Sequence, residues 1–376
     1  MTMISDLPIS LVEEILSRVP LKNMGAVRLT CKEWDALSKS RSFSKMHIGK
    51  LSAADESMIV VLMDYNLYLM RVVQAVNEDP FIERIGKLNK QNKISKVFHC
   101  GGLLLCDLRE DKTRVIVCNP YWGQTRSIEL SRYSYFTWRF DTFRHALGYE
   151  DKGSYRSYKL LIRFTDQYYY TPTNECSLYR IYDFDSSLWK TLDITTLWSI
   201  RYHHHGVSVK GNTYWPASLI NSPTEDYIIS FDFTSESFGP LLRLPFDPMY
   251  SENVTLSCVR EEKLAVLFRN AEVGEFEIWI STKIEAKEVL WSKFLSVEME
   301  TGSFSLTRNN SFFIDEEKKV AMGNCKTFKI VGEAGYLKKM ELVERAGRDG
   351  NLYMENACSY VPSLVQIKQP ASGRKR

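Results

Sequence analysis

The first forty residues carry apolar side chains at the spacing of short helices. In LPISLVEEILSRVP, residues 7–20, apolar positions recur every three or four residues with charged ones between them, and Pro20 prevents the helix from continuing. Ser10 and Glu13 have the spacing of a capping box, in which each side chain accepts a backbone N–H at the start of the helix. This pattern predicts an amphipathic helix that begins near Ser10.

Two further short helices are expected after the first. Residues 21–29 again place apolar side chains at helical spacing, and Thr30 with Glu33 forms a second capping box that opens a helix containing Trp34. Helices shorter than about 12 residues are marginal in water, and domains below about 40 residues usually need a metal, disulfides or a partner. Neither metal-ligand spacing nor a disulfide pair is present in this module, so we expect another surface to cover its apolar face.

Beyond residue 58 the pattern changes from helical to extended. Six times the chain gives an apolar stretch, a polar or glycine-containing turn and a second apolar stretch, which is the signature of a β-hairpin. Successive turns lie roughly 50 residues apart, and further strand pairs lie between several of them. The residues that mark the six turns are Tyr65, Arg109, Lys152, Gly211, Glu262 and Glu317.

This repeat predicts a mainly β chain with a small all-α N-terminal module. Four strands in every repeat of about 50 residues are typical of a β-propeller, here with about five or six blades. The apolar segment at 359–367 is expected to pair with an early strand and close the ring, which removes exposed strand edges. An array of two-sheet sandwiches is the alternative that a loose repeat leaves open.

Composition and charge narrow the choice of partners. The chain has 376 residues, and 49 basic against 46 acidic side chains give a net charge of +3 without a basic stripe, so nothing indicates nucleic acid binding. The apolar runs fall short of the about 20 residues that a membrane-spanning helix needs. Eight cysteines without a CxxC pair are typical of reduced thiols. We expect an intracellular protein, in the nucleus, the cytoplasm or both, that binds no membrane.

The N-terminal module resembles an F-box, and the likeness runs from Leu7 and Pro8 through Arg28 to Trp34. That family docks on the Skp adaptor of a cullin-RING ubiquitin ligase, and the resemblance implies the same partner here. It implies adaptor-facing roles for Leu7, Pro8, Leu11, Ile15, Leu16, Val19 and Pro20. It assigns Arg28, Cys31 and Trp34 to the contacts that hold the three helices together.

Residues 97–368 resemble the type 1 F-box associated domain of plants. The similar segments include CGGLLLC from residue 100, VCNPYWGQTRSIEL from 117 and GVSVKGNTYWPAS from 206, in the family's order. In that family the domain is a kelch-like substrate-recognition module fused to an F-box. With the polar junction before residue 58, the resemblances imply an F-box at 1–45, a linker at 46–57, a recognition domain at 58–370 and a basic tail at 371–376.

The sequence contains no catalytic constellation. His203 and His205 would share one face of a strand, but no third ligand accompanies them, so we expect neither a metal nor a cofactor. The paired acids at predicted turns lie beside lysines, where solvation explains them. The phosphate-loop, nucleophile-elbow and HExxH motifs are absent.

Aromatic side chains gather in two stretches that have the composition of long loops. Exposed aromatics on loops are typical of protein-binding patches, while other loops pack back on their own scaffold. The candidate target-binding residues are Tyr133, Tyr135, Phe136, Trp138, Tyr168, Tyr169 and Tyr170.

The sequence therefore predicts a non-catalytic substrate-recognition subunit of an SCF-type (Skp-cullin-F-box) ubiquitin ligase complex. The helices would bind the Skp adaptor, and the propeller would hold a target protein for ubiquitination and degradation. Two other classes stay open at this point: a propeller enzyme with an incidental helical cap, and an adaptor-bound scaffold without a degradation target.

Overall fold

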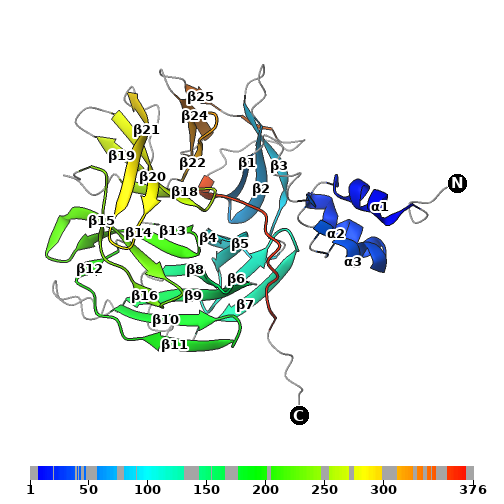
Figure 1. The fold of residues 1–376 in the computed structure, drawn as a ribbon, viewed down its shortest axis with the longest axis horizontal. Helices are drawn as coiled ribbons and strands as arrows, with labels where there is room; N and C mark the ends of the chain where they lie inside the picture. Colours follow the sequence, from blue (N-terminus) through cyan, green and yellow to red (C-terminus); the bar gives the residue numbers. More distant parts are fainter. Residues whose placement is uncertain are drawn as a thin grey trace, which may run out of the picture.

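The chain folds into a three-helix module beside a ring of β-sheets (Figure 1). The computed structural model describes residues 7–19, 21–38, 40, 42–43, 46–47, 57–73, 80–89, 91–130, 144–153, 155–165, 177–200, 205–246, 254–270, 275–298, 311–324, 328–332, 337–339, 341–343 and 354–369.

The three predicted helices are present as α1 (Ile9–Leu16), α2 (Leu21–Thr30) and α3 (Lys32–Ser38). Both predicted capping boxes are wrong. Pro8 precedes α1 without a side-chain cap, which leaves Ser10 inside the helix. Thr30 is the last residue of α2, and its hydroxyl donates to the Ala26 carbonyl. The acceptor at the start of α3 is the Cys31 sulfur, which lies 3.4 Å from the Trp34 backbone nitrogen.

The helical module has a small apolar core of its own. Val12 and Leu16 of α1, Met24 of α2 and Phe43 are buried against one another. Six half-buried side chains surround them, and these are Leu7, Val19, Val27, Trp34, Leu37 and Met46. A core of this size leaves apolar surface on the helices uncovered.

The strands form six sheets, which are the six blades of a β-propeller. This count lies within the predicted range of about five or six and rules out the sandwich array. The first blade has the order β26 (Glu341–Val343), β3 (Phe81–Lys87), β2 (Asn66–Val73), β1 (Ser57–Met63), β27 (Met354–Ser359). The second contains β4 (Ile94–Cys100), β5 (Leu103–Leu108), β6 (Arg114–Asn119) and β7 (Gln124–Glu129).

The other four blades follow in chain order. The third contains β8 (Arg144–Asp151), β9 (Arg156–Thr165), β10 (Ser177–Asp183) and β11 (Leu188–Leu192). The fourth contains β12 (Trp198–Ser199), β13 (Val207–Val209), β14 (Asn212–Leu219), β15 (Ser222–Asp232), β16 (Ser237–Phe238) and β17 (Leu242–Arg243). The fifth contains β18 (Val254–Val259), β19 (Lys263–Asn270), β20 (Glu275–Ile284) and β21 (Val289–Glu298). The sixth contains β22 (Phe312–Asp315), β23 (Val320–Asn324), β24 (Phe328–Gly332) and β25 (Leu337–Lys339).

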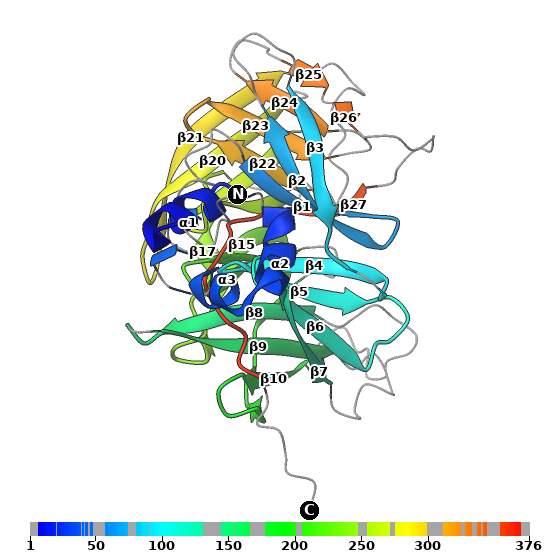
Figure 2. The same cartoon turned by 90° about the vertical axis from the view of Figure 1, so that its right-hand side faces the viewer.

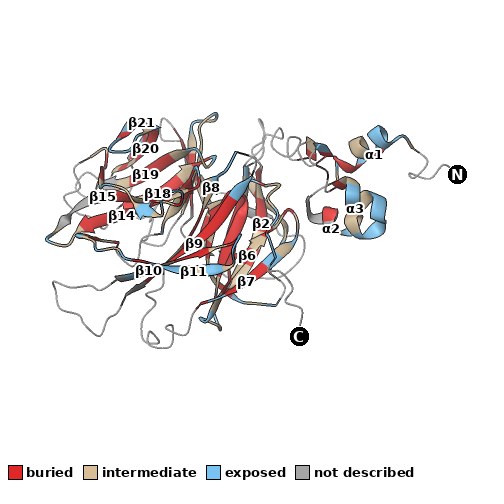
Figure 3. Ribbon diagram, turned by 60° about the horizontal axis from the view of Figure 1, so that its bottom comes forward, coloured by how far each residue is buried: buried red, intermediate tan, exposed pale blue. Residues whose placement is uncertain are grey.

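Each pair of neighbouring blades is joined by an apolar cluster. Figure 3 shows the buried residues along the strands of the ring. In β1, Ile59 and Val61 pack against the sixth blade, whereas Val60 and Leu62 pack against the second. Successive side chains of a strand point to opposite faces, and here both faces are covered, so the positions from Ile59 to Met63 are all apolar. This arrangement explains the uninterrupted apolar run at 59–63.

All six predicted hairpins are present, and each predicted marker lies in a connection between two strands. Two of the turns show why their residues suit them. At Asp64–Tyr65 the backbone φ angles are 48° and 60°, and at Lys210–Gly211 they are 51° and 87°. Two-residue turns whose twist matches the flanking strands need positive φ at both positions, which polar residues and glycine tolerate best.

The ring is closed by β27, which pairs antiparallel with β1, so that the two ends of the propeller share one sheet. The predicted closing segment, 359–367, is misplaced, because only Ser359 of it belongs to β27. Residues 360–369 form no strand, and we call them the C-terminal strap. The Tyr360 backbone N–H donates to the Met58 carbonyl of β1 at 2.9 Å, and further along the strap the Asn119 side chain of the second blade donates to the carbonyls of Ser363 and Val365.

Candidate functional site

Helix α1 carries two adjacent apolar stripes that face different surroundings. Val12 and Leu16, with 6% and 3% of their surface exposed, pack into the core of the helical module. Leu11 and Ile15 are 50% and 41% exposed. They share their side of the helix with exposed Pro8, at spacings of three and four residues. We call this outer stripe of Pro8, Leu11 and Ile15 the docking stripe.

The structure divides the predicted adaptor-facing set. The prediction that Leu16 faces the adaptor is corrected by the structure, because the Leu16 side chain is buried among the module's own helices. Leu7 and Val19 are half-buried against the same core, and Pro20 lies outside the described residues. Two exposed apolar side chains that the prediction omitted are Ile9 on α1 and Leu29 at the end of α2.

The residues predicted to hold the helices together have three different roles. Trp34 is half-buried on the module core. The prediction that Cys31 holds the helices together is corrected by the structure, because the Cys31 side chain is exposed. Its sulfur accepts from the Trp34 backbone N–H at the start of α3. Arg28 links α2 to α3 by donating to the Ser38 hydroxyl at 3.2 Å, and its side chain also reaches beyond the helical module to the propeller. Its guanidinium donates to the Tyr121 carbonyl at 3.0 Å, between β6 and β7.

A junction of polar and aromatic contacts fastens the helical module to the second blade. Figure 2 shows α2 beside β4 and β5 of this blade. The Arg28 guanidinium lies 4.5 Å from the centre of the Trp122 ring, a cation–π distance. Buried His47 lies with Nε2 2.8 Å from the Val19 carbonyl and Nδ1 3.0 Å from the Tyr121 hydroxyl. A carbonyl only accepts, so Nε2 carries a proton, and in the neutral ring Nδ1 accepts from the tyrosine hydroxyl. No local pattern in the sequence signals this junction, because Arg28 and His47 lie more than seventy residues before Tyr121.

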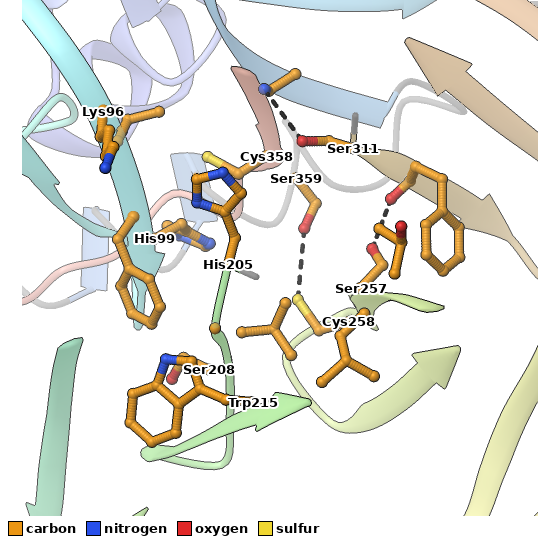
Figure 4. Close-up of a pocket in the computed structure, with 18 of the residues that line it drawn as sticks. Lys96, His99, His205, Ser208, Trp215, Ser257, Cys258, Ser311, Cys358 and Ser359 are labelled. Atoms are coloured by element: carbon orange, nitrogen blue, oxygen red, sulfur yellow. Dashed lines mark hydrogen bonds between the residues drawn. The ribbon is translucent and has the colours of Figure 1, made fainter. Parts of the chain in front are cut away.

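A second candidate site is a cavity of about 130 Å³ on the axis of the ring, which we call the axial pocket (Figure 4). All six blades contribute to its lining, for example through Cys358, Lys96, His145, Ser208, Ser257 and Phe312. Ligands of propellers and other ring-shaped folds bind where several elements converge on such a cavity. The pocket is therefore the part of the propeller with the geometry to enclose a small group.

Hairpin turns of the second, fourth and fifth blades are hydrogen-bonded to one another. The Glu261 carboxylate accepts from the Gly101 backbone N–H at 2.6 Å, and the Glu261 carbonyl accepts from the Lys210 N–H at 2.9 Å. The Gly211 carbonyl accepts from the Tyr149 N–H at 3.1 Å. Turns of the second, fourth and fifth blades thus meet, and Tyr149 of strand β8 adds the third blade.

Buried His99 lines the axial pocket and contacts two of these turns. Its Nε2 accepts from the Gly102 backbone N–H at 3.2 Å, and its Nδ1 lies 3.2 Å from the Glu261 carboxylate. The Tyr360 ring packs against the imidazole with 5.5 Å between ring centres. Burial lowers the pKa of His99, and the nearby Glu261 charge opposes this only in part. A proton on Nε2 would break the bond to Gly102, so the neutral ring is the form that fits.

This arrangement predicts a loss of stability in mild acid. Because the pKa of His99 is lower in the folded chain, the unfolded chain binds the extra proton first as the pH falls below about 6.5. We expect the free energy of unfolding to drop between pH 7 and pH 5. Replacing His99 with glutamine should remove up to about 1.4 kcal/mol per pH unit from that slope. Urea unfolding at several pH values measures it, and an unchanged slope in the variant would contradict this role.

The lining of the axial pocket includes ionisable side chains. Lys96 and His205 are among them (Figure 4), and Asp107 and His145 also line the pocket. The Asp107 carboxylate lies 2.7 Å from His145 Nδ1, and this histidine lowers the pKa of Asp107 despite its burial. The Asp107 carboxylate therefore already has a partner, His145, among the residues that line the pocket.

Other predicted site residues lie outside the described part of the chain. These are His203 and all seven aromatic target-binding candidates, Tyr133, Tyr135, Phe136, Trp138, Tyr168, Tyr169 and Tyr170, whose roles stay predictions. Among the residues that the structure describes, no group of three or more His, Cys, Asp or Glu side chains is placed to hold a metal ion. In that same part of the chain no helix is long and apolar enough to cross a bilayer.

The fold and its two sites define a chain of two parts, a helical docking module and a β-propeller with an axial pocket. Two family models match these parts: the F-box domain at residues 4–46 and the F-box associated β-propeller domain at residues 58–367. The chain belongs to the plant family of F-box proteins that carry this associated propeller.

Individual relatives agree with that membership. An Arabidopsis thaliana F-box protein is 51% identical, over 100% of this chain and 93% of its own length. An F-box/kelch-repeat protein of the same plant is 50% identical, over 100% of this chain and 92% of its own length. Among solved structures, a chain of Kuenenia stuttgartiensis hydrazine synthase aligns over 71% of this chain and 73% of its own, at 12% identity and a TM-score of 0.34, a likeness too low to inform either fold or function.

Proposed function

We propose that this chain is the substrate-recognition subunit of an SCF-type ubiquitin ligase complex. The observation that carries the proposal is the docking stripe: Leu11 and Ile15 lie half exposed on α1, within a module that the F-box family model matches. F-box domains in general partner with a Skp adaptor and, through it, with a cullin. An exposed apolar stripe beside a small core is the surface that such a partner would cover.

The propeller is the part that we propose to hold the target. The junction at Arg28, His47 and Tyr121 fastens the F-box to the second blade, so a target on the propeller would sit at a defined position relative to the adaptor. The chain would supply proximity, which raises the effective concentration of target lysines near the ubiquitin carrier. Neither matching family model names an enzyme, which supports a non-catalytic role.

An experiment in plant cells tests the complete proposal. The full chain and a variant with Leu11→Asp and Ile15→Asp are expressed with a proximity label, and labelled proteins are compared with and without proteasome inhibition. A target should be labelled by both forms, should become ubiquitinated only with the wild-type chain, and should accumulate with the variant. The matched control is Leu188→Asp, which changes an exposed leucine of the third blade. Labelled proteins whose ubiquitination and levels are the same with both forms would contradict a receptor role and favour a scaffold.

A further inference from the structure

The turn between β6 and β7 is bound by two distant parts of the chain, and we call its residues 119–122 the shared turn. Asn119 is fully buried, and its side-chain oxygen accepts from the backbone N–H groups of Tyr121 at 2.8 Å and Trp122 at 3.3 Å. The nitrogen of the same amide donates to the carbonyls of Ser363 at 3.1 Å and Val365 at 2.6 Å in the C-terminal strap. One side chain therefore shapes the shared turn and also holds the strap.

The helical module binds the same turn. Arg28 donates to the Tyr121 carbonyl and lies over the Trp122 ring, and His47 contacts the Tyr121 hydroxyl. Tyr121 and Trp122 are the two residues whose backbone N–H groups are held by Asn119. The position of the F-box on the propeller therefore depends on the shape that Asn119 gives to the shared turn.

The strap also supports the shared turn through apolar side chains. Tyr360 of the strap lies in the same buried cluster as Tyr121, and half-buried Leu364 and Trp122 pack against that cluster. Unseating the strap would take both acceptors from the Asn119 amide, and a buried donor without an acceptor is unfavourable. The side chain would then turn to other partners, and the shared turn would lose the support that fixes its shape.

The junction between module and turn is only partly satisfied. Arg28 Nη2 and Trp122 Nε1 are buried, and among the residues that the structure describes neither has a protein acceptor. Burial also lowers the pKa of the Arg28 guanidinium, because it opposes the charge. These costs weaken the docked arrangement of the module, so the support from the strap can decide whether the module stays docked.

We infer that the C-terminal strap controls the position of the F-box on the propeller through the shared turn. With the strap seated, Asn119 holds the turn in the shape that Arg28 and His47 bind, and with the strap unseated, the helical module leaves this position. Thermodynamic linkage makes the effect reciprocal, so docking of the module tightens the strap by the same factor. The inference goes beyond the proposed function, because it concerns how the two parts of the chain are held together and not what either part binds.

Double electron–electron resonance on the full chain measures the position of the module. Nitroxide labels are attached through a ketone-bearing unnatural amino acid at Glu33 of α3 and Ser127 of β7, both exposed and outside the junction. Leu364→Asp should unseat the strap, because seating would bury an unpaired charge. Asn119→Asp keeps an acceptor for the turn but replaces the donor to the strap carbonyls. We expect both variants to lower the ratio of docked to undocked molecules at least about fivefold and to show a second label distance.

Hydrogen exchange of the strap amides, followed by mass spectrometry, shows on the same chains whether the strap is seated. Exchange should be faster in both aspartate variants, whereas Gln366→Asp, at an exposed position of the strap, should match the wild-type chain. Arg28→Ala changes no residue of the strap, yet linkage predicts strap exchange at least about fivefold faster, and Lys32→Ala at an exposed position of α3 is its control. Thermal unfolding shows that each variant is folded, and Leu364→Asp keeps the test valid if Asn119→Asp unfolds.

Three results would overturn the inference. The first is a folded Leu364→Asp chain whose strap exchanges faster while its label distances stay those of the wild-type chain. The second is strap exchange that Arg28→Ala leaves unchanged, because linkage requires the effect in both directions. The third is wild-type strap exchange in both aspartate variants, which would show that the contacts of Asn119 and Leu364 do not seat the strap.

Discussion

Replacing Arg126 with alanine is expected to lower the free energy of unfolding by about 3 to 5 kcal/mol. Arg126 lies in β7 and is almost fully buried. Its guanidinium donates to the carbonyls of Phe184 at 3.1 Å and Lys368 at 2.5 Å, and to the hydroxyls of Tyr182 at 2.6 Å and Ser187 at 2.9 Å. One side chain thus ties the second blade, the third blade and the C-terminal strap together. Its loss leaves four acceptors without their donor.

The matched control is Arg114→Ala in β6 of the same blade. Arg114 is about half exposed and contacts Asp111, an exposed pair whose loss costs at most about 1 kcal/mol. Chemical unfolding in urea, followed by tryptophan fluorescence, compares the two variants with the wild-type chain. Equal stability of both variants would contradict the role given to the strap.

Replacing Gly148 with alanine is expected to destabilise the propeller by about 3 kcal/mol. Gly148 lies in β8, where the third blade packs on the fourth. A Cβ atom there would lie 2.0 Å from the buried Phe233 ring and 2.5 Å from the Gly211 carbonyl oxygen. Neither neighbour is a flexible chain end, so the blades would have to move apart.

Gly86→Ala is the control for this prediction. Gly86 lies in β3, and a Cβ atom there would meet nothing within 4 Å, so the change should stay within about 1 kcal/mol. Thermal unfolding by circular dichroism measures both variants. A Gly148→Ala chain that unfolds at the wild-type temperature would show that the close contact between the third and fourth blades is not a constraint.

The propeller was predictable because its signals are local. Two apolar stretches and a polar turn between them predict each hairpin, and turns such as Lys210–Gly211 need residues that accept positive φ. The continuous apolar runs reflect strands covered on both faces, as in β1. The closing strand was misplaced because β27 carries the polar residues Glu355, Asn356 and Ser359, whereas the strap that follows it is more apolar. The long-range bonds from Asn119 that hold the strap have no local signal in the sequence.

The candidate site was predictable only in part. Periodicity identifies α1 as amphipathic, but Ile15 and Leu16 are neighbours in a helix and both are aliphatic, so the sequence does not say which faces inward. The structure shows that Leu16 faces inward, where it packs with Met24 and Phe43. The junction at His47 and the axial pocket depend on residues brought together by ring closure, which no local pattern records.

The claim that the docking stripe binds the Skp adaptor is tested most directly by calorimetric titration of the purified adaptor into the full chain. Wild-type chain and the Leu188→Asp control should bind alike. The Leu11→Asp and Ile15→Asp double variant should lose at least about a hundredfold in affinity, because it would bury two unpaired carboxylates, while its module stays folded. A folded double variant that binds the adaptor as tightly as the wild-type chain would contradict the account.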